Sequence, residues 1–175
     1  MTDDPQAIRL DEFLPYPPDR VWRAFVEPRL VTKWLGPEDF QPVVGHRFTI
    51  VAQAVPTTRF DGVIHCQVLA IEPERLLRIS WEDHGPSGAR CTATWRLVAE
   101  GHGTRLFFDH EGFDPGNELQ QRARRIMGGG WRSWLFTRLA AALAAGEPAR
   151  EPAREAAKGA AGGEPAREVP CEGRP

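Results

Sequence analysis

The sequence predicts an α+β fold in which a curved antiparallel sheet packs against one long helix near the carboxyl end. Residues 127–143 carry apolar side chains at the spacing of a helix with one buried face. They are Trp131, Trp134, Leu135, Leu139, Ala142 and Leu143. Most of the preceding chain alternates apolar and polar residues with a period of two, which is typical of strands. We expect the helix to lie in the concavity of the sheet, with a hydrophobic cavity where the packing is incomplete.

The amino-terminal region predicts one strand followed by two short helices. Residues 8–14 alternate weakly, as a half-buried strand does. Proline is accepted in the first turn of a helix, and apolar residues follow at helical spacing, so we expect a helix over residues 18–26. Pro28 ends this helix, and a second one is expected over residues 29–35, before Gly36 and Pro37.

From residue 45 onward the alternation predicts about five further strands, which makes six or seven in all. They are centred on residues 46–50, 60–71, 77–81, 91–97 and 106–110. The connections are short, so the sheet should be an antiparallel meander. Gly62 lies inside the second of these runs, where it indicates a bulge or a close approach of another backbone segment.

Residues 114–126 are polar and rich in arginine, and they are either a lid-like loop or a first, exposed segment of the terminal helix. Residues 128–130 are three consecutive glycines, which should interrupt or start that helix because glycine is costly inside one. From residue 146 onward Glu-Pro-Ala-Arg recurs and aromatic residues are absent. We therefore predict a folded domain over residues 1–145 and a disordered tail over residues 146–175.

Composition favours a cytoplasmic protein without a membrane span. The net charge is −2, which gives no reason to expect nucleic acid or an anionic membrane as partner. The three cysteines have no ligand-like spacing and fit a reducing compartment. The amino terminus is acidic, unlike a signal peptide, and no apolar run approaches the roughly 18 residues of a membrane helix.

The sequence predicts neither a cofactor nor a metal. The three glycines lack the Gly-Lys-Ser/Thr that follows a phosphate-binding loop. No two of the five histidines lie four residues apart on a helix. His110 differs from the other histidines because its strand face also carries Leu106 and Phe108. A histidine on an apolar face is more often a hydrogen-bonded structural residue than a catalyst, but His110 is the best polar candidate in the expected cavity.

Nine short motifs in order resemble the SRPBCC superfamily. They are residues 17–25, 34–37, 44–48, 60–63, 68–76, Trp81, and residues 103–106, 110–113 and 130–131. Within the superfamily, the chain is similar to single-domain bacterial proteins of the branch named for the activator of the Hsp90 ATPase. This resemblance covers roughly residues 8–143. It implies the helix-grip fold of START-like and birch-pollen-allergen-like proteins, in which a curved sheet holds a carboxyl-terminal helix over a hydrophobic cavity.

The resemblance implies a broad range of functions, because the superfamily includes lipid carriers, plant hormone receptors, and aromatases and cyclases. Eukaryotic chaperone activators depend on a separate amino-terminal domain with an Asn-Asn-Trp-His-Trp motif, which this sequence does not contain. Chaperone activation is therefore not the activity that we expect first.

The leading hypothesis is that the protein binds a small hydrophobic or aromatic molecule between the sheet and the terminal helix. The residues expected to contact it are Phe48, Trp81, Phe108, His110, Trp131, Trp134 and Leu135. One alternative is an enzyme of the cyclase or dehydratase kind, with His110 as general acid or base. Another is an interaction module, either co-chaperone-like or a homodimer formed through exposed aromatic residues in the segment 34–40.

Overall fold

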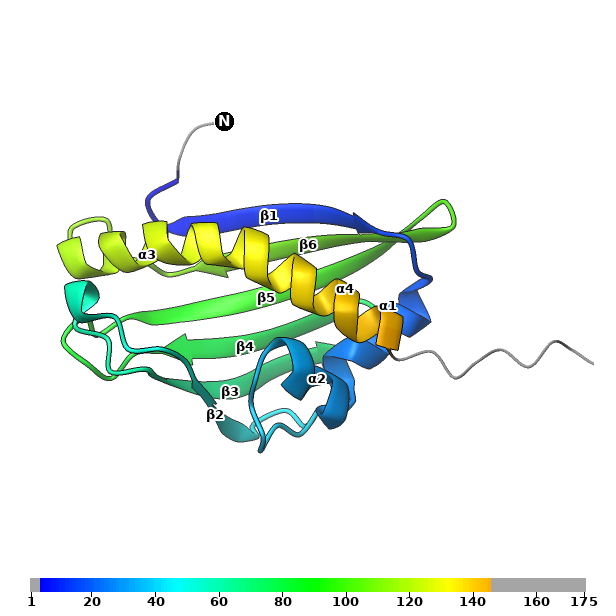
Figure 1. The fold of residues 1–175 in the computed structure, drawn as a ribbon, viewed down its shortest axis with the longest axis horizontal. Coiled ribbons are helices and arrows are strands. Elements are labelled where there is room, and N and C mark those ends of the chain that lie inside the picture. The colour runs from blue at the N-terminus through cyan, green and yellow to red at the C-terminus, as the bar shows by residue number, and fades with distance from the viewer. Residues whose placement is uncertain (1–3, 146–175) are drawn as a thin grey trace, which may run out of the picture.

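The computed structural model describes residues 4–145, and the predicted tail at 146–175 lies outside them. The fold is a six-stranded antiparallel sheet in the order β1-β6-β5-β4-β3-β2, crossed on one face by the terminal helix (Figure 1). The strands are β1 (Ala7–Leu14), β2 (Arg47–Val51), β3 (Val63–Glu72), β4 (Leu76–Glu82), β5 (Arg90–Glu100) and β6 (Gly103–Glu111). The helices are α1 (Pro18–Val26), α2 (Pro28–Trp34), α3 (Glu118–Gly130) and α4 (Phe136–Ala145), with a 3-10 turn η1 (Pro56–Thr58) and a π-helical turn η2 (Trp131–Leu135). The predicted α+β architecture is confirmed.

The alternation of side chains along the central strands produces the buried face of the sheet. In β4 and β5, Leu77 lies opposite Trp95 and Trp81 lies opposite Cys91. All four side chains are buried, and so are Ile79 and Ala93, which lie between them on the same face, while the alternating residues Arg78, Ser80 and Thr92 are less buried. Because directly opposed side chains contact each other across a strand pair, these rows form a continuous apolar floor beneath the helix.

The connection between β2 and β3 differs from the prediction, since β3 begins at Val63 rather than at residue 60. Pro56 starts the 3-10 turn, and Phe60 then forms an isolated bridge with Val55. Gly62 has a φ of +98°, and a Cβ there would lie 2.7 Å from the carbonyl oxygen of Ala52. The predicted close approach at Gly62 is therefore confirmed, and it explains why the strand starts only after this residue.

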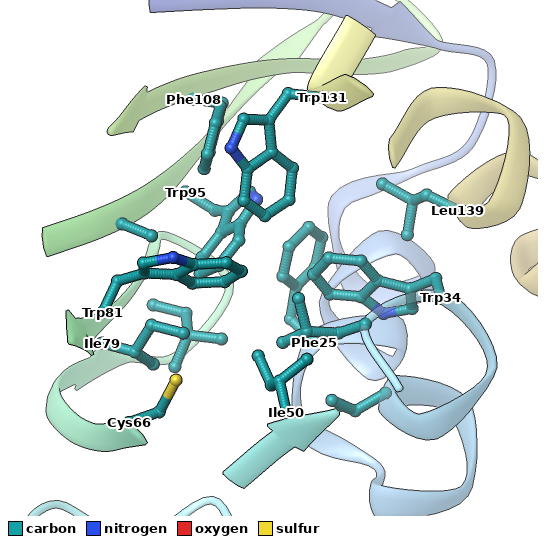
Figure 2. Packing of buried hydrophobic residues seen from close by; sticks show 14 of the residues in the cluster. Phe25, Trp34, Ile50, Cys66, Ile79, Trp81, Trp95, Phe108, Trp131 and Leu139 are labelled. Atoms are coloured by element: carbon teal, nitrogen blue, oxygen red, sulfur yellow. The ribbon is translucent and has the colours of Figure 1, made fainter. Parts of the chain in front are cut away.

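The two short helices form a corner that closes one end of the sheet. Each has a proline in its first turn, and α2 begins and ends one residue earlier than expected. Trp34 donates a hydrogen bond from Nε1 to the carbonyl oxygen of Ala24 at 2.7 Å. Its ring packs edge-on against Phe25 and Trp95 (Figure 2).

The proposed aromatic dimer surface in the segment 34–40 is not present in this structure. Trp34, Leu35 and Phe40 are all buried. Phe40 packs edge-on against Phe48, with ring centroids 5.3 Å apart. The prediction was wrong because the corner folds these side chains inward, where they fill the core.

The terminal helix begins earlier than its apolar pattern indicates. Asn117 is the N-cap, and its side-chain oxygen accepts hydrogen bonds from the backbone N–H groups of Leu119 and Gln120. Residues 118–126 are thus the first segment of the helix rather than a loop. Residues 128–130 neither start nor interrupt it, because packing on both sides of the glycines outweighs their poor helix propensity.

The π-helical turn η2 aligns the two halves of the terminal helix. Eight residues of an ideal α-helix place Trp131 and Leu139 about 80° out of line. A π turn absorbs one extra residue, which brings both side chains to the buried face of the helix. Both are buried, and the Ser133 hydroxyl donates a hydrogen bond to the carbonyl oxygen of Gly129 at 3.1 Å.

Gly129→Ala is expected to raise the free energy of unfolding by about 0.5–1 kcal/mol. Gly129 has a helical φ, and a Cβ added there meets no atom within 4 Å. Urea titration monitored by circular dichroism would measure the change. The matched control is Gly62→Ala, which should destabilise the protein because of its positive φ and its close carbonyl neighbour. A loss of stability in Gly129→Ala would contradict this account of the helix.

Candidate functional site

A cavity of about 790 Å³ lies between the sheet and the terminal helix. Its floor is formed by the apolar residues Ile50, Ile64, Trp81, Ala89 and Cys91. Its roof is formed by the helix residues Ala123, Ile126, Met127, Gly130 and Trp131. At the rim, the side chains of Val51 and Ile126 are 78% and 47% exposed. The cavity therefore opens to solvent between the edge strand β2 and helix α3.

Two of the predicted contact residues, Trp81 and Trp131, line this cavity. Trp81 projects from the floor and Trp131 from the roof, and their rings meet edge-to-face with centroids 5.2 Å apart (Figure 2). The side chains of Trp134 and Leu135 lie outside the part of the structure that is described.

Three other predicted residues lie in the core, away from the wall of this cavity. Phe108 packs behind Trp131, with ring centroids 4.6 Å apart. His110 is also buried beside Trp131. Phe48 contacts Phe40 and lines a smaller, polar depression instead. All three side chains point inward, as the alternation pattern predicts. Trp131 packs against Phe108 and His110, and Phe40 packs against Phe48, so these three residues do not line the cavity.

His110 is held as a neutral imidazole. It has no exposed surface, and burial lowers its pKa to about 3. Its Nδ1 accepts a hydrogen bond from Trp131 Nε1 at 3.1 Å, so the proton of the neutral ring is on Nε2. Within the described residues, Nε2 has no hydrogen-bond partner. This geometry makes His110 a structural support for the tryptophan that roofs the cavity.

The polar end of the cavity is formed by Asp83, Ser87 and Thr58. Asp83 Oδ2 accepts a hydrogen bond from the Ser87 hydroxyl, and Oδ1 accepts one from the backbone N–H of Gly85 at 2.7 Å. The predicted contact residues did not include this end, because Asp83, Ser87 and Thr58 lie in or beside loops of the sequence. A signal was present, since Asp83 is two residues after Trp81 and continues the inward alternation just past the end of β4.

Three side chains fasten the start of α3 to this polar end. Asn117 Nδ2 and Gln120 Nε2 donate hydrogen bonds to the carbonyl oxygen of Ser87, at 3.2 and 2.9 Å. Arg122 donates to the carbonyl oxygen of Thr57 at 2.9 Å. Helix α3 is therefore attached at its beginning to the two loops that close this end of the cavity.

The cysteine in the cavity wall is a neutral thiol. Burial raises the pKa of Cys91 to about 12, so its reactive thiolate is scarce at neutral pH. Burial also raises the pKa of Cys66 far above its ordinary value. Across residues 4–145, no three His, Cys, Asp or Glu side chains are grouped so as to hold a metal ion. No helix in this range is both long and apolar enough to cross a membrane.

An antiparallel sheet that holds a carboxyl-terminal helix over an apolar cavity is the helix-grip architecture of the SRPBCC superfamily. The sequence model described as "Activator of Hsp90 ATPase homolog 1-like protein" matches residues 15–144. The chain belongs to this family.

Solved structures with the same fold include protein MLL2253 from Mesorhizobium loti. It is 31% identical, with a TM-score of 0.68, and the match covers 82% of this chain and all of that one. Protein CV1439 from Chromobacterium violaceum is 25% identical, with a TM-score of 0.59 over 80% of this chain and 98% of that one. DynU16, a protein in the dynemicin biosynthetic locus, is 27% identical, with a TM-score of 0.62 over 84% of this chain and 49% of that one. A search of curated proteins gives no match.

Proposed function

We propose that this protein binds a small hydrophobic or aromatic molecule in the cavity between the sheet and the terminal helix. The observation that carries the proposal is the cavity itself, about 790 Å³ in volume and lined mainly by apolar and aromatic side chains. Ligand sites typically have volumes of roughly 300–1,000 Å³ and combine an apolar wall with a few convergent polar groups. Here the polar groups Asp83, Ser87 and Thr58 lie together at one end.

In this proposal Trp81 and Trp131 make the main aromatic contacts with the ligand. Phe108 and His110 support Trp131 without contact with the ligand. Both pack on the Trp131 ring, and His110 accepts the hydrogen bond from the Trp131 indole N–H. That bond sets the orientation of the Trp131 ring and so the shape of the roof. Phe48 supports the β2 end of the sheet without contact with the ligand.

Entry of a ligand is proposed to involve movement of α3. The hydrogen bonds of Asn117, Gln120 and Arg122 hold the start of this helix. Its other end carries three glycines followed by a π turn, and such turns recur at functional sites. Breaking a few hydrogen bonds at an exposed helix end is a low-cost local opening. Figure 1 shows α3 lying over one half of the sheet, with α4 over the other.

An enzyme of the cyclase or dehydratase kind remains the alternative hypothesis, and the likeness to DynU16 from a biosynthetic locus is what favours it. The position of His110 argues against direct acid–base chemistry by this residue in the cavity. A general base must reach the proton that it removes, and the imidazole is enclosed by aromatic rings. We therefore favour binding, in a protein that we still expect to be cytoplasmic.

Filling the cavity should abolish binding without unfolding the protein. Ala123 lines the roof, so Ala123→Trp would place a ring inside the cavity. We expect the affinity for the fluorescent apolar probe N-phenyl-1-naphthylamine to fall about tenfold or more in this variant. The matched control is Ala141→Trp, at an exposed position of α4, which should bind the probe like the wild type.

Native mass spectrometry of the purified protein would detect a co-purifying molecule directly. Circular dichroism would establish that both variants are folded. Saturable probe binding that Ala123→Trp leaves unchanged would place the site elsewhere on the protein. Failure of the wild type to bind this probe or any member of a panel of fatty acids, sterols and polycyclic phenols would contradict the proposed function.

A further inference from the structure

The polar end of the cavity contains an anionic group that has no cationic partner among residues 4–145. From this we infer the class of ligand: an amphiphile with an apolar or aromatic body and a protonated amine that pairs with Asp83. The inference rests on the proposed function, because it assumes that the cavity is the binding site. Asp83 is half-buried and lines the cavity wall.

The fold holds the Asp83 carboxylate in a defined orientation. Its backbone N–H donates to the carbonyl oxygen of Ala89 at 2.9 Å, which extends the β4–β5 ladder by one step beyond the strands. Ser87 donates to one carboxylate oxygen and Gly85 to the other. Ser87 is itself buried, and its carbonyl oxygen is held by Asn117 and Gln120. A group fixed in this way loses little conformational entropy when it binds a ligand.

The charge of Asp83 is not neutralised by any residue in the part of the chain that the structure describes. Among the ion pairs formed by residues 4–145, none includes Asp83. Its two hydrogen bonds come from neutral donors, and each carboxylate oxygen keeps a further acceptor position. An anion beside an apolar wall gains most from a ligand cation, because a charge-assisted hydrogen bond there is stronger than one in water.

The aromatic part of the wall favours the same ligand class. Trp81 is two residues before Asp83 and projects from the same face of the sheet, and Phe113 and Trp131 also line the cavity. The faces of these rings attract an ammonium group and repel a carboxylate. The other charged residue of the wall, Arg138, is exposed on α4 and already takes part in another interaction. Figure 1 shows the β4–β5 connection and α4 at opposite ends of the sheet.

Three probes with the same apolar chain would test this inference. Decylamine, decanol and decanoate differ at pH 7 in whether the head group is cationic, neutral or anionic. We would measure how each displaces N-phenyl-1-naphthylamine from the full-length protein. The expected result is that decylamine binds about tenfold or more tightly than decanol, and decanoate most weakly.

The variant Asp83→Asn should remove the preference for decylamine while decanol still binds. The matched control is Glu82→Gln, since Glu82 is the preceding residue and pairs with His84 on the other face of the sheet. Ser87→Ala provides a second variant, because it removes a hydrogen bond to Asp83 without removing the charge, and it should reduce the preference partially. Thermal melting would confirm that each variant is folded.

The outcomes distinguish this inference from the proposed function. Equal binding of decylamine and decanol, or a preference that survives Asp83→Asn, would overturn the inference while the cavity remains a ligand site. Tightest binding of decanoate would also overturn it and would direct attention to the end of the cavity near Arg138. Failure of all three compounds and of the fluorescent probe to bind would overturn both.

Discussion

Replacing Trp131 with alanine is expected to lower the free energy of unfolding by about 3–5 kcal/mol. The side chain is only 4% exposed and contacts the rings of Trp81, Trp95 and Phe108, with centroids 5.2, 6.3 and 4.6 Å away. Its removal also leaves Nδ1 of His110 without its donor inside the core. An unsatisfied buried polar atom adds its own desolvation cost to that of the cavity.

Urea unfolding of Trp131→Ala and of Trp22→Ala would measure this effect against a matched control. Trp22 is a half-buried residue of α1 that packs at the margin of the core, so its loss should cost clearly less. Trp131→Phe should fall between the two, because it keeps an aromatic ring but loses the hydrogen bond. A cost below about 1 kcal/mol for Trp131→Ala would show that the roof of the cavity is not part of the cooperative core.

The stability of the protein is expected to fall steeply with acidification below pH 6.5 because of His110. Its pKa is about 3 in the folded state and about 6.5 in the unfolded chain, where it is exposed. Between these values the unfolded state binds the proton and the folded state does not, so unfolding takes up a proton. Above pH 6.5 the titration of His110 does not reduce the free energy of unfolding. Between pH 6.5 and pH 3 it lowers the free energy of unfolding by about 1.4 kcal/mol per pH unit.

The variant His110→Gln isolates this effect from the titration of the carboxylates. Glutamine does not titrate, and its side-chain oxygen can accept the indole hydrogen bond of Trp131. Between pH 6.5 and pH 5 the wild type should lose about 2 kcal/mol more stability than the variant. Parallel stability profiles of the two proteins over this interval would mean that His110 is accessible to protons in the folded state.

The sequence predicted most of the sheet correctly because strand alternation is a local signal. The inward positions Leu77, Ile79 and Trp81 are all buried. The same rule placed Phe108 and His110 on the inner face, and both are buried there. What it did not decide was which inward side chains contact the cavity, because several rings compete for the same space.

The terminal helix shows where local rules fail. Glycine propensity predicted a break at residues 128–130, but the helix continues through them into the π turn η2. That turn depends on the simultaneous burial of Trp131 and Leu139 in the core, which no residue pattern within the helix specifies. Local rules also did not predict the polar end of the cavity. Asp83 and Ser87 form this end together with helix α3, whose residues Asn117 and Gln120 are hydrogen-bonded to Ser87.

By itself, the sequence determined the order of strands and helices, the antiparallel meander and the aromatic character of the core. These follow from periodicity, turn residues and apolar content, which act over a few neighbouring residues. Only the tertiary structure decided that Trp81 and Trp131 face the cavity while His110 lies enclosed behind them. The physical reason is that a cavity is the space that packing leaves unfilled, and its position depends on how the whole helix, the whole sheet and the loops between them fit together.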